Sequence, residues 1–294
     1  MQPEDVPAFR LSDIHLSYDK LSVLEGLDFE LASGQVVGLI GANGAGKSTL
    51  IRILLGLIEP QSGIAELAGE PAAALSAATR GRVGYVPQSS KLFAWLDGAG
   101  MLRYFGAFYP GFDLAYAEAL AQRLKVSLNT SIQLLSPGQQ QRLSIVRALS
   151  TRPDILILDE PMAALDPAGR LEVIEQLVAE QRQRPMSILI SSHITQDLQR
   201  LCTELAVLHG GRIAMQAPLG KFQGLARVTV TGPESSLASF TFEGAHHVRA
   251  EGTSSRCFVV DANDLPVMMA QLPTDLQATP ASQDLETVVS EWMR

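Results

Sequence analysis

The segment Gly41–Ser48, which reads Gly-Ala-Asn-Gly-Ala-Gly-Lys-Ser, constrains the fold more than any other feature. It follows the apolar run Gln35–Ile40 and precedes the mainly apolar run Thr49–Leu55. A strand, a glycine-rich loop and a helix in this order are typical of a phosphate-binding loop. Glycines let successive backbone N–H groups point at one anion, and the helix adds the positive end of its dipole. We therefore expect a nucleotide to bind these residues: Gly41, Ala42, Asn43, Gly44, Ala45, Gly46, Lys47, Ser48 and Thr49.

Four side chains then predict a reaction centre. Lys47 provides a mobile positive charge for the β- and γ-phosphates, and the Ser48 hydroxyl can bind Mg²⁺. The apolar run Ile155–Leu158 is followed by two acids and is typical of a buried strand in a parallel sheet. Asp159 would then lie at the carboxyl end of that strand, where ligands bind in such sheets. We expect Asp159 to share Mg²⁺ with Ser48, and Glu160 to act as general base for the attacking water.

A second segment, Leu135–Gln139, has the pattern of a helix start. Ser136 and Gln139 are spaced as in a capping box, and Pro137 would occupy the first helical position, where its missing N–H costs little. The helix should continue to Leu149, and its start would present N–H groups, a hydroxyl and a positive dipole end. From capping alone, an ordinary capped helix is the better interpretation.

Together these motifs resemble those of ATP-binding-cassette (ABC) ATPase subunits, over about residues 9–221. Leu135–Gln139 resembles the family signature Leu-Ser-Gly-Gly-Gln, with Pro137 in place of the first glycine. The other family motifs follow in the right order and spacing, with Tyr18 as the aromatic under the adenine ring, Gln88 as the Q-loop glutamine, Asp166 in the D-loop and His193 as the switch histidine. The resemblance implies an α/β P-loop NTPase cassette with an inserted helical subdomain.

The resemblance also implies a mechanism. Two cassettes would dimerise head to tail, so that each ATP lies between the Gly41–Ser48 loop of one subunit and the signature segment of the other. Glu160 would position or deprotonate water while His193 holds the γ-phosphate in line. The remaining family roles are Mg²⁺ binding by Ser48, Gln88 and Asp159, contact with the partner's ATP by Ser136, Pro137, Gly138 and Gln139, and a dimer contact by Asp166.

Two departures from the family pattern affect these expectations. Pro137 removes one N–H near the sandwiched phosphate, and we expect activity to survive that loss. Met162, Ala163 and Ala164 stand where the family commonly has Thr-Ser-Gly, which leaves Asp166 as the main polar group of the D-loop.

Composition argues against several protein classes. The 294 residues carry a net charge of -8 and a pI of about 5.2, so we expect no nucleic-acid partner. No apolar run approaches the roughly 18 residues of a transmembrane helix. The polar, acidic start Met1–Asp5 is unlike a signal peptide. Cys202 and Cys257 lie in apolar or strand-like stretches, which suits reduced thiols, and His246–His247 is expected in a solvated loop without a ligand set.

The pattern predicts two parts along the chain. We expect an ABC ATPase domain over 9–221, with its helical subdomain at about 89–150, and a small α+β accessory domain over 225–294. Asp113 and Asp166 should cap helices. In the accessory part we expect strands at Ala226–Thr231 and Arg256–Val260, a helix at Leu265–Leu272, and a tail helix with its apolar residues at helical spacing, namely Leu285, Val288, Val289 and Trp292. This tail resembles that of ATPases serving ABC-2-type exporters.

An aromatic group follows the Q-loop glutamine. The family places the docking groove for its membrane subunit in this region, so some of these side chains would hold a coupling helix. Alternatively, they form the core of the helical subdomain. The sequence leaves both interpretations open for the group, which consists of Phe93, Trp95, Tyr104, Phe105, Phe108, Tyr109 and Phe112.

The resemblance therefore implies an ATP- and Mg²⁺-dependent motor subunit of an ABC transporter. It would be peripheral, on the cytoplasmic side of the cell membrane, with a separate integral membrane permease and a second nucleotide-binding subunit as partners, and it would form a homodimer. We expect export, because sugar-type importers carry a longer C-terminal module.

The alternative is a soluble ABC-type ATPase of the translation or DNA-repair kind, without a permease. Translation-type chains usually carry two cassettes, and repair-type chains carry long coiled coils between these motifs. Here one cassette is present, and the 88 residues between Lys47 and Ser136 (48–135) contain no heptads. A regulator without turnover is disfavoured because Glu160 and His193 are both present.

Overall fold

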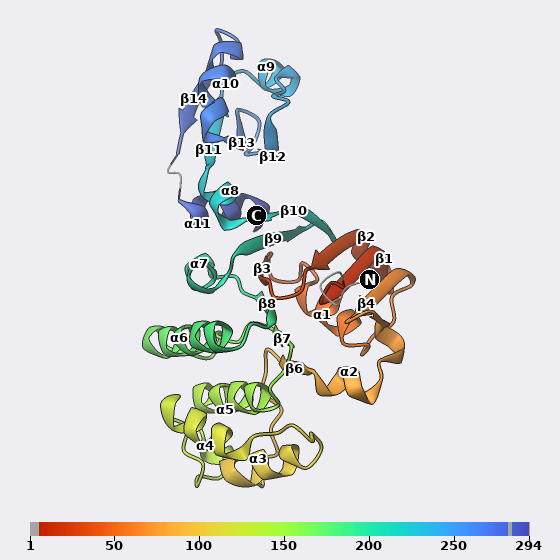
Figure 1. Cartoon of the computed structure of the whole chain (residues 1–294). Helices are drawn as coiled ribbons and strands as arrows, with labels where there is room; N and C mark the ends of the chain where they lie inside the picture. Colours follow the sequence, from red (N-terminus) through yellow and green to blue (C-terminus); the bar gives the residue numbers. More distant parts are fainter. Residues whose placement is uncertain (1–5, 282–283, 294) are drawn as a thin grey trace.

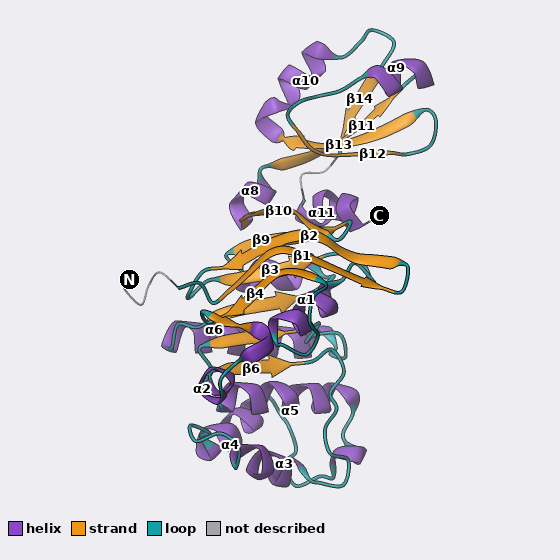
Figure 2. Cartoon of the chain, turned by 90° about the vertical axis from the view of Figure 1, so that its right-hand side faces the viewer, coloured by secondary structure: helices purple, strands orange, loops and turns teal. Residues whose placement is uncertain are grey.

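The computed structural model describes residues 6–281 and 284–293. A C-terminal sheet lies at one end of the molecule, and helices α3 (Gly98–Gly106), α4 (Leu114–Arg123) and α5 (Pro137–Ser150) lie at the other, with two further sheets between them (Figures 1 and 2). The α/β class and the helical insertion predicted from the sequence are confirmed. None of the described helices has the length and apolar content needed to span a bilayer.

The central sheet has the strand order β10-β9-β3-β8-β7-β6. Its neighbouring strands run parallel, except that β10 runs antiparallel to β9. Every residue of β3, β7 and β8 is buried, which is the pattern expected of strands covered on both faces. The strands are β3 (Val36–Ile40), β6 (Val83–Val86), β7 (Ile155–Leu158), β8 (Ser187–Ser191), β9 (Glu204–His209) and β10 (Arg212–Pro218).

An antiparallel sheet covers one face of the central sheet. Its strands β2-β1-β4-β5 share a hydrophobic core with α1 (Lys47–Leu54) and with side chains of β3, β7 and β8. The short helix α2 (Ala77–Gly81) follows this sheet in the chain. The strands are β1 (Phe9–Tyr18), β2 (Leu21–Leu31), β4 (Ser62–Leu67) and β5 (Glu70–Pro71).

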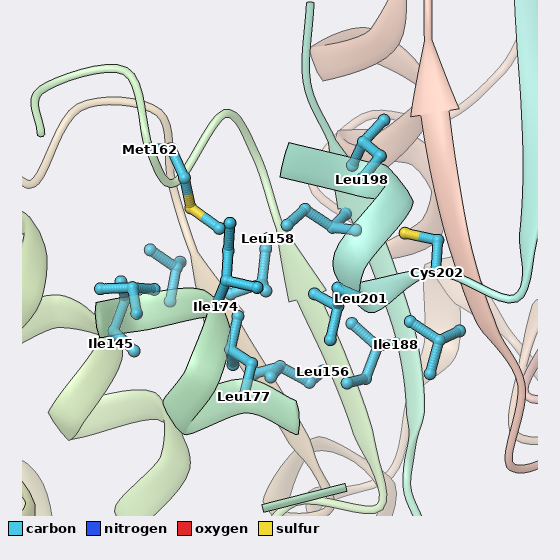
Figure 3. Close-up of a cluster of buried hydrophobic side chains, with 14 of the residues drawn as sticks. Ile145, Leu156, Leu158, Met162, Ile174, Leu177, Ile188, Leu198, Leu201 and Cys202 are labelled. Carbon is cyan, nitrogen blue, oxygen red and sulfur yellow. The ribbon is translucent and has the colours of Figure 1, made fainter. Parts of the chain in front are cut away.

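Helices α5, α6 (Pro167–Gln183) and α7 (Thr195–Leu201) contribute to the core on the opposite face. Figure 3 shows apolar side chains of these helices packed against those of β7 and β8. The helices contribute Ile145, Ile174, Leu177, Leu198 and Leu201, and the strands contribute Leu156, Leu158 and Ile188. Asp113 and Asp166 cap α4 and α6 by accepting hydrogen bonds from backbone N–H groups, at 2.8 and 2.9 Å, so both predicted caps are confirmed.

The C-terminal sheet is antiparallel, with the order β12-β13-β11-β14. Buried side chains of this sheet and of two short helices form a small separate core, which confirms the predicted α+β character. The elements after β10 are α8 (Leu219–Gln223), β11 (Leu225–Thr231), α9 (Glu234–Ser239), β12 (Ala245–Ala250), β13 (Ser255–Asp261), α10 (Leu265–Gln271), β14 (Gln277–Pro280) and α11 (Leu285–Met293).

The tail helix α11 connects this sheet to the cassette. Its apolar residues pack into the cassette core beside β9 and α7, and each buried side chain contributes on the order of 2 kcal/mol. On the sheet side, the buried Glu291 carboxylate accepts hydrogen bonds from Arg227 and Arg249 at 2.6 and 2.9 Å. Burial alone would raise the pKa of Glu291, but these two arginines lower it below its usual value, so the carboxylate remains charged.

The prediction for His246–His247 is wrong in one respect, because both residues lie on β12 and not in a loop. His246 pairs with Asp261 at 3.0 Å, and the His247 ring packs against His209 and Trp292. The inward side of β12 presents polar residues to α11, so the strand lacks the apolar alternation that would have predicted it. Within the described residues, no cluster of three or more acids, histidines and cysteines is suited to hold a metal ion.

The two cysteines are buried free thiols, as the sequence predicted. Burial raises the pKa of Cys257 to about 12, and it raises the pKa of Cys202 as well. Both side chains are therefore protonated and unreactive at neutral pH.

Candidate functional site

A cavity of about 440 Å³ lies over the glycine-rich loop. All of its lining residues except Val23, near the start of β2, were expected from the sequence to belong to the site. This cavity therefore brings together residues from four separate parts of the chain. It is lined by Tyr18, Val23, Asn43, Gly44, Gly46, Lys47, Ser48, Thr49, Gln88 and Glu160.

The loop needs its glycines for two different reasons. Gly44 and Gly46 have φ values of 81° and 105°, in the left-handed region that side chains disfavour. Gly41 has no positive φ, but a Cβ there would lie 2.7 Å from the Leu208 carbonyl oxygen. Gly41 therefore permits the close approach of the loop to β9, which corrects the reason expected from the sequence.

Lys47 is held at the floor of the cavity. Its Nζ donates hydrogen bonds to the carbonyl oxygens of Gly41 at 2.7 Å and Ala42 at 3.2 Å. The same atom lies 3.5 Å from Glu160 Oε1, and both side chains are buried, with 7% and 8% exposed. A buried ammonium needs such partners, and incoming phosphate oxygens can replace them.

Glu160 lies between Lys47 and His193. Its Oε2 is 2.9 Å from Nδ1 of His193, whose side chain is half exposed. Glu160 has a φ of 46°, which is uncommon for a residue with a side chain and turns this carboxylate toward the cavity instead of along β7. The Glu160 carboxylate lines the cavity, and the His193 imidazole, which does not line it, contacts this carboxylate. A carboxylate held in this way is suited to act as a general base toward water.

Ser191, at the end of β8, positions both acids. Its Oγ donates to Asp159 Oδ1 at 2.9 Å and accepts the backbone N–H of Glu160 at 2.8 Å. The sequence analysis did not assign a role to Ser191. The signal was present, because a polar residue at the carboxyl end of a strand next to β7 must lie beside the end of β7.

The residues predicted to hold Mg²⁺ fit that ion by their chemistry. Ser48 and Gln88 line the cavity, whereas Asp159 is buried and does not line it. A hydroxyl, an amide oxygen and one carboxylate are suitable ligands for a cation that usually keeps waters and also binds substrate phosphates.

Tyr18 and Val23 also line the cavity. The Tyr18 side chain belongs to the last residue of β1, and 44% of the residue is exposed. An exposed ring beside an apolar side chain offers a flat surface on which a planar base can stack. That Tyr18 lies under an adenine ring stays a prediction.

The signature residues lie in a different cavity, of about 610 Å³. Ser136 caps α5 by accepting the Gln139 N–H at 3.2 Å, and Pro137 occupies the first turn, so the predicted helix start is confirmed. The two cavities share no lining residue. The second is lined by Lys125, Ser136, Pro137, Gly138, Gln139, Arg142, Ala164, Leu165 and Asp166.

The aromatic group divides between core and surface. Phe93, Phe105 and Phe112 are partly buried and pack against the core. Trp95 and Phe108 are 77% and 65% exposed, and Tyr104 is also exposed. The core interpretation is therefore confirmed for the buried rings, whereas docking of a membrane subunit on the exposed ones stays a prediction. We call the exposed residues Trp95, Tyr104 and Phe108 the aromatic face.

Comparison with known proteins identifies the relatives of this chain. The profile of the ABC transporter family matches residues 24–163. A Nod factor export ATP-binding protein I from Paraburkholderia xenovorans is 32% identical over 292 residues, covering 96% of this chain and 95% of the relative. The protein of that name from Burkholderia lata is 35% identical over 258 residues, covering 84% of each chain. A solved structure of the ATP-binding subunit of an ABC transporter is 31% identical, with a TM-score of 0.65, and covers 74% of this chain and 92% of that one.

Proposed function

The chain belongs to the ABC transporter family as an ATP-binding subunit with ATPase activity, and from this premise we propose that it is the motor of an exporter. In this proposal two copies dimerise on binding ATP and drive a separate integral membrane permease. Residues 9–221 form the ATPase unit, and residues 225–294 form an accessory unit joined to it by α11. The observation that carries the proposal is the division of the motif residues between two cavities.

The division matters because neither cavity is complete. The loop cavity is lined by Lys47, Ser48, Gln88 and Glu160, but by no residue of the signature segment. The signature cavity offers the start of α5 without a loop to hold a nucleotide. A head-to-tail dimer joins one cavity of each kind at two symmetric places, which is the closed two-fold arrangement that most homodimers adopt.

Within such a composite site the residues have distinct tasks. The loop N–H groups and Lys47 bind the phosphates, and Tyr18 stacks on the base. Bound Mg²⁺, held by Ser48, Gln88 and Asp159, would neutralise phosphate charge. Glu160 accepts a proton from the attacking water while His193 keeps the glutamate and the γ-phosphate in register. Catalysis is then mainly positioning and charge neutralisation.

Two observations support a permease partner over the soluble alternative. The aromatic face presents large aromatic side chains to solvent on α3 and just before and after it, in the region that follows Gln88. Exposed apolar patches of this kind mark protein interaction sites. The two relatives are named as export proteins, and this favours export for the present chain. Their names specify Nod factors as the cargo, and we do not extend that cargo to this chain. Attachment through a permease would place the chain peripherally, on the cytoplasmic side of the membrane.

A complementation experiment tests the composite site. We expect Lys47→Ala and Ser136→Glu to abolish turnover when each variant is assayed alone, because the first removes the phosphate cation and the second places a carboxylate against the partner's γ-phosphate. In an equal mixture, half of the dimers are mixed and each has one intact site, so phosphate release should recover to about a quarter of the parent value. Full turnover by Ser136→Glu alone would contradict the composite site.

A further inference from the structure

Helix α5 holds the segment around Gln88 through three side chains on one side of the helix. Gln141 Nε2 donates to the Pro87 carbonyl at 3.3 Å. Ser90 Oγ donates to Gln141 Oε1 at 2.6 Å and accepts from Ser144 Oγ at 2.9 Å. These contacts flank Gln88 on both sides, so the position of this glutamine depends on α5.

Arg147 makes the third contact, one turn further along α5. Its NH2 group donates to the Tyr85 carbonyl at 3.0 Å, three residues before Gln88. Tyr85 lies on β6, which is the last strand of the central sheet. One row of carbonyls on an edge strand has no neighbouring strand, and Arg147 satisfies one of them. Breaking this bond would leave the strand that leads into Gln88 free to move.

The opposite side of the Arg147 guanidinium faces α3. Its central carbon lies 4.7 Å from the centroid of the Phe105 ring, in a cation–π contact. Phe105 in turn lies against Phe93, with centroids 6.2 Å apart, and Phe93 stacks on Trp95 at 4.9 Å. The contacts therefore run without a gap from the aromatic face to the strand before Gln88.

The environment of Arg147 is unusual for a cation. Burial lowers its pKa, although an arginine stays charged at any physiological pH. Across residues 6–281 and 284–293, no carboxylate forms an ion pair with it. A partly buried charge without an ion-pair partner costs free energy, so a purely structural role would be served better by an apolar side chain. A guanidinium can bind both the Phe105 ring and the Tyr85 carbonyl, which an apolar side chain cannot do.

We propose that Arg147 is a positioning residue for Gln88, and that it links the aromatic face to the Mg²⁺ end of the nucleotide cavity. It acts through β6 and does not touch the nucleotide. The inference rests on the proposed function, because it takes Gln88 as a ligand of Mg²⁺ and the aromatic face as the docking site. In this account, a partner that moves the aromatic face also moves Gln88.

The test measures Mg²⁺ dependence without turnover. A fluorescent ATP analogue is bound to the full chain in a Glu160→Gln background, and Mg²⁺ is then titrated. We expect Arg147→Met to weaken the apparent Mg²⁺ affinity about tenfold, as the loss of a residue that supports a metal ligand typically does. Nucleotide binding in EDTA should be unchanged. Arg147→Lys, which keeps the charge, should restore most of the affinity. Arg103→Met, an exposed arginine on α3, is the matched control and should behave as the parent.

The outcomes separate this inference from the proposed function. If the parent itself fails to bind the analogue with Mg²⁺, the proposed function fails. If the parent binds and Arg147→Met gives the same Mg²⁺ titration, only the role of Arg147 is overturned. Loss of nucleotide binding in EDTA as well would assign Arg147 to the fold alone. Phe105→Leu keeps the arginine and removes the ring, so it should shift the Mg²⁺ affinity in the same direction by a smaller factor.

The link to the aromatic face has its own readout. The chain has two tryptophans, of which Trp95 is exposed and Trp292 is buried, so acrylamide quenches mainly Trp95. Binding of Mg²⁺ and the analogue should change this quenching in the parent, and Arg147→Met should abolish the change. Unchanged quenching in the parent, or an identical change in the variant, would overturn the link.

Discussion

Replacing Lys47 by alanine is expected to weaken ATP binding by at least about a hundredfold. The ammonium makes two hydrogen bonds to loop carbonyls in the absence of nucleotide, and phosphate oxygens would take their place. Two charge-assisted hydrogen bonds contribute about 3 kcal/mol together, which corresponds to a factor of about a hundred in the dissociation constant. The loss also leaves Glu160 as a buried carboxylate near the phosphates, and this adds repulsion.

Equilibrium titration with a fluorescent ATP analogue measures this effect. The matched control is Lys221→Ala, which removes a lysine of α8 that pairs with Asp261 of β13 and does not line the cavity. An exposed pair of this kind contributes little, so the control should bind as the parent does. Affinity for ATP that survives Lys47→Ala within a few fold would show that the loop is not the phosphate site.

Replacing Glu160 by glutamine is expected to lower the rate of phosphate release about a thousandfold while ATP remains bound. The amide keeps the shape of the side chain but cannot accept a proton from water. It also removes a negative charge beside the γ-phosphate, so ATP-bound dimers should accumulate and elute early in size-exclusion chromatography with ATP. Glu175→Gln, an exposed position on α6 that lines neither cavity, should leave both properties unchanged. Turnover of Glu160→Gln within a few fold of the parent would exclude Glu160 as the general base.

The fold class and the family could be predicted from the sequence because their signals are local. The loop Gly41–Ser48, the strand Ile155–Leu158 and the start of α5 each depend on a few consecutive residues, and their flanking runs have clear periodicity. The roles of the residues on these elements remain predictions, because they depend on a nucleotide, a metal ion and a partner subunit.

The features that the sequence did not reveal depend on contacts between distant segments. Ser191 is one serine among many until β8 places it beside β7. On the inner side of β12, His247 contacts Trp292 of α11 and Arg249 donates a hydrogen bond to Glu291 of α11. Because these inward residues are polar, β12 lacks the alternation of apolar and polar residues that predicts a strand. Arg147 likewise has no local signal, since its partners lie on β6 and α3.

The most direct test of the central claim captures partners from membranes of the native host. Tagged Glu160→Gln is incubated with ATP and detergent-solubilised membranes, and the bound proteins are identified by mass spectrometry. A matched sample carries Trp95→Ala and Phe108→Ala in addition, which removes most of the aromatic face and leaves both cavities intact. We predict that one integral membrane protein with several spans is recovered with the first sample and lost with the second. Recovery of only soluble proteins, or of none, while the ATP-bound dimer still forms, would contradict the claim that this ATPase drives a permease.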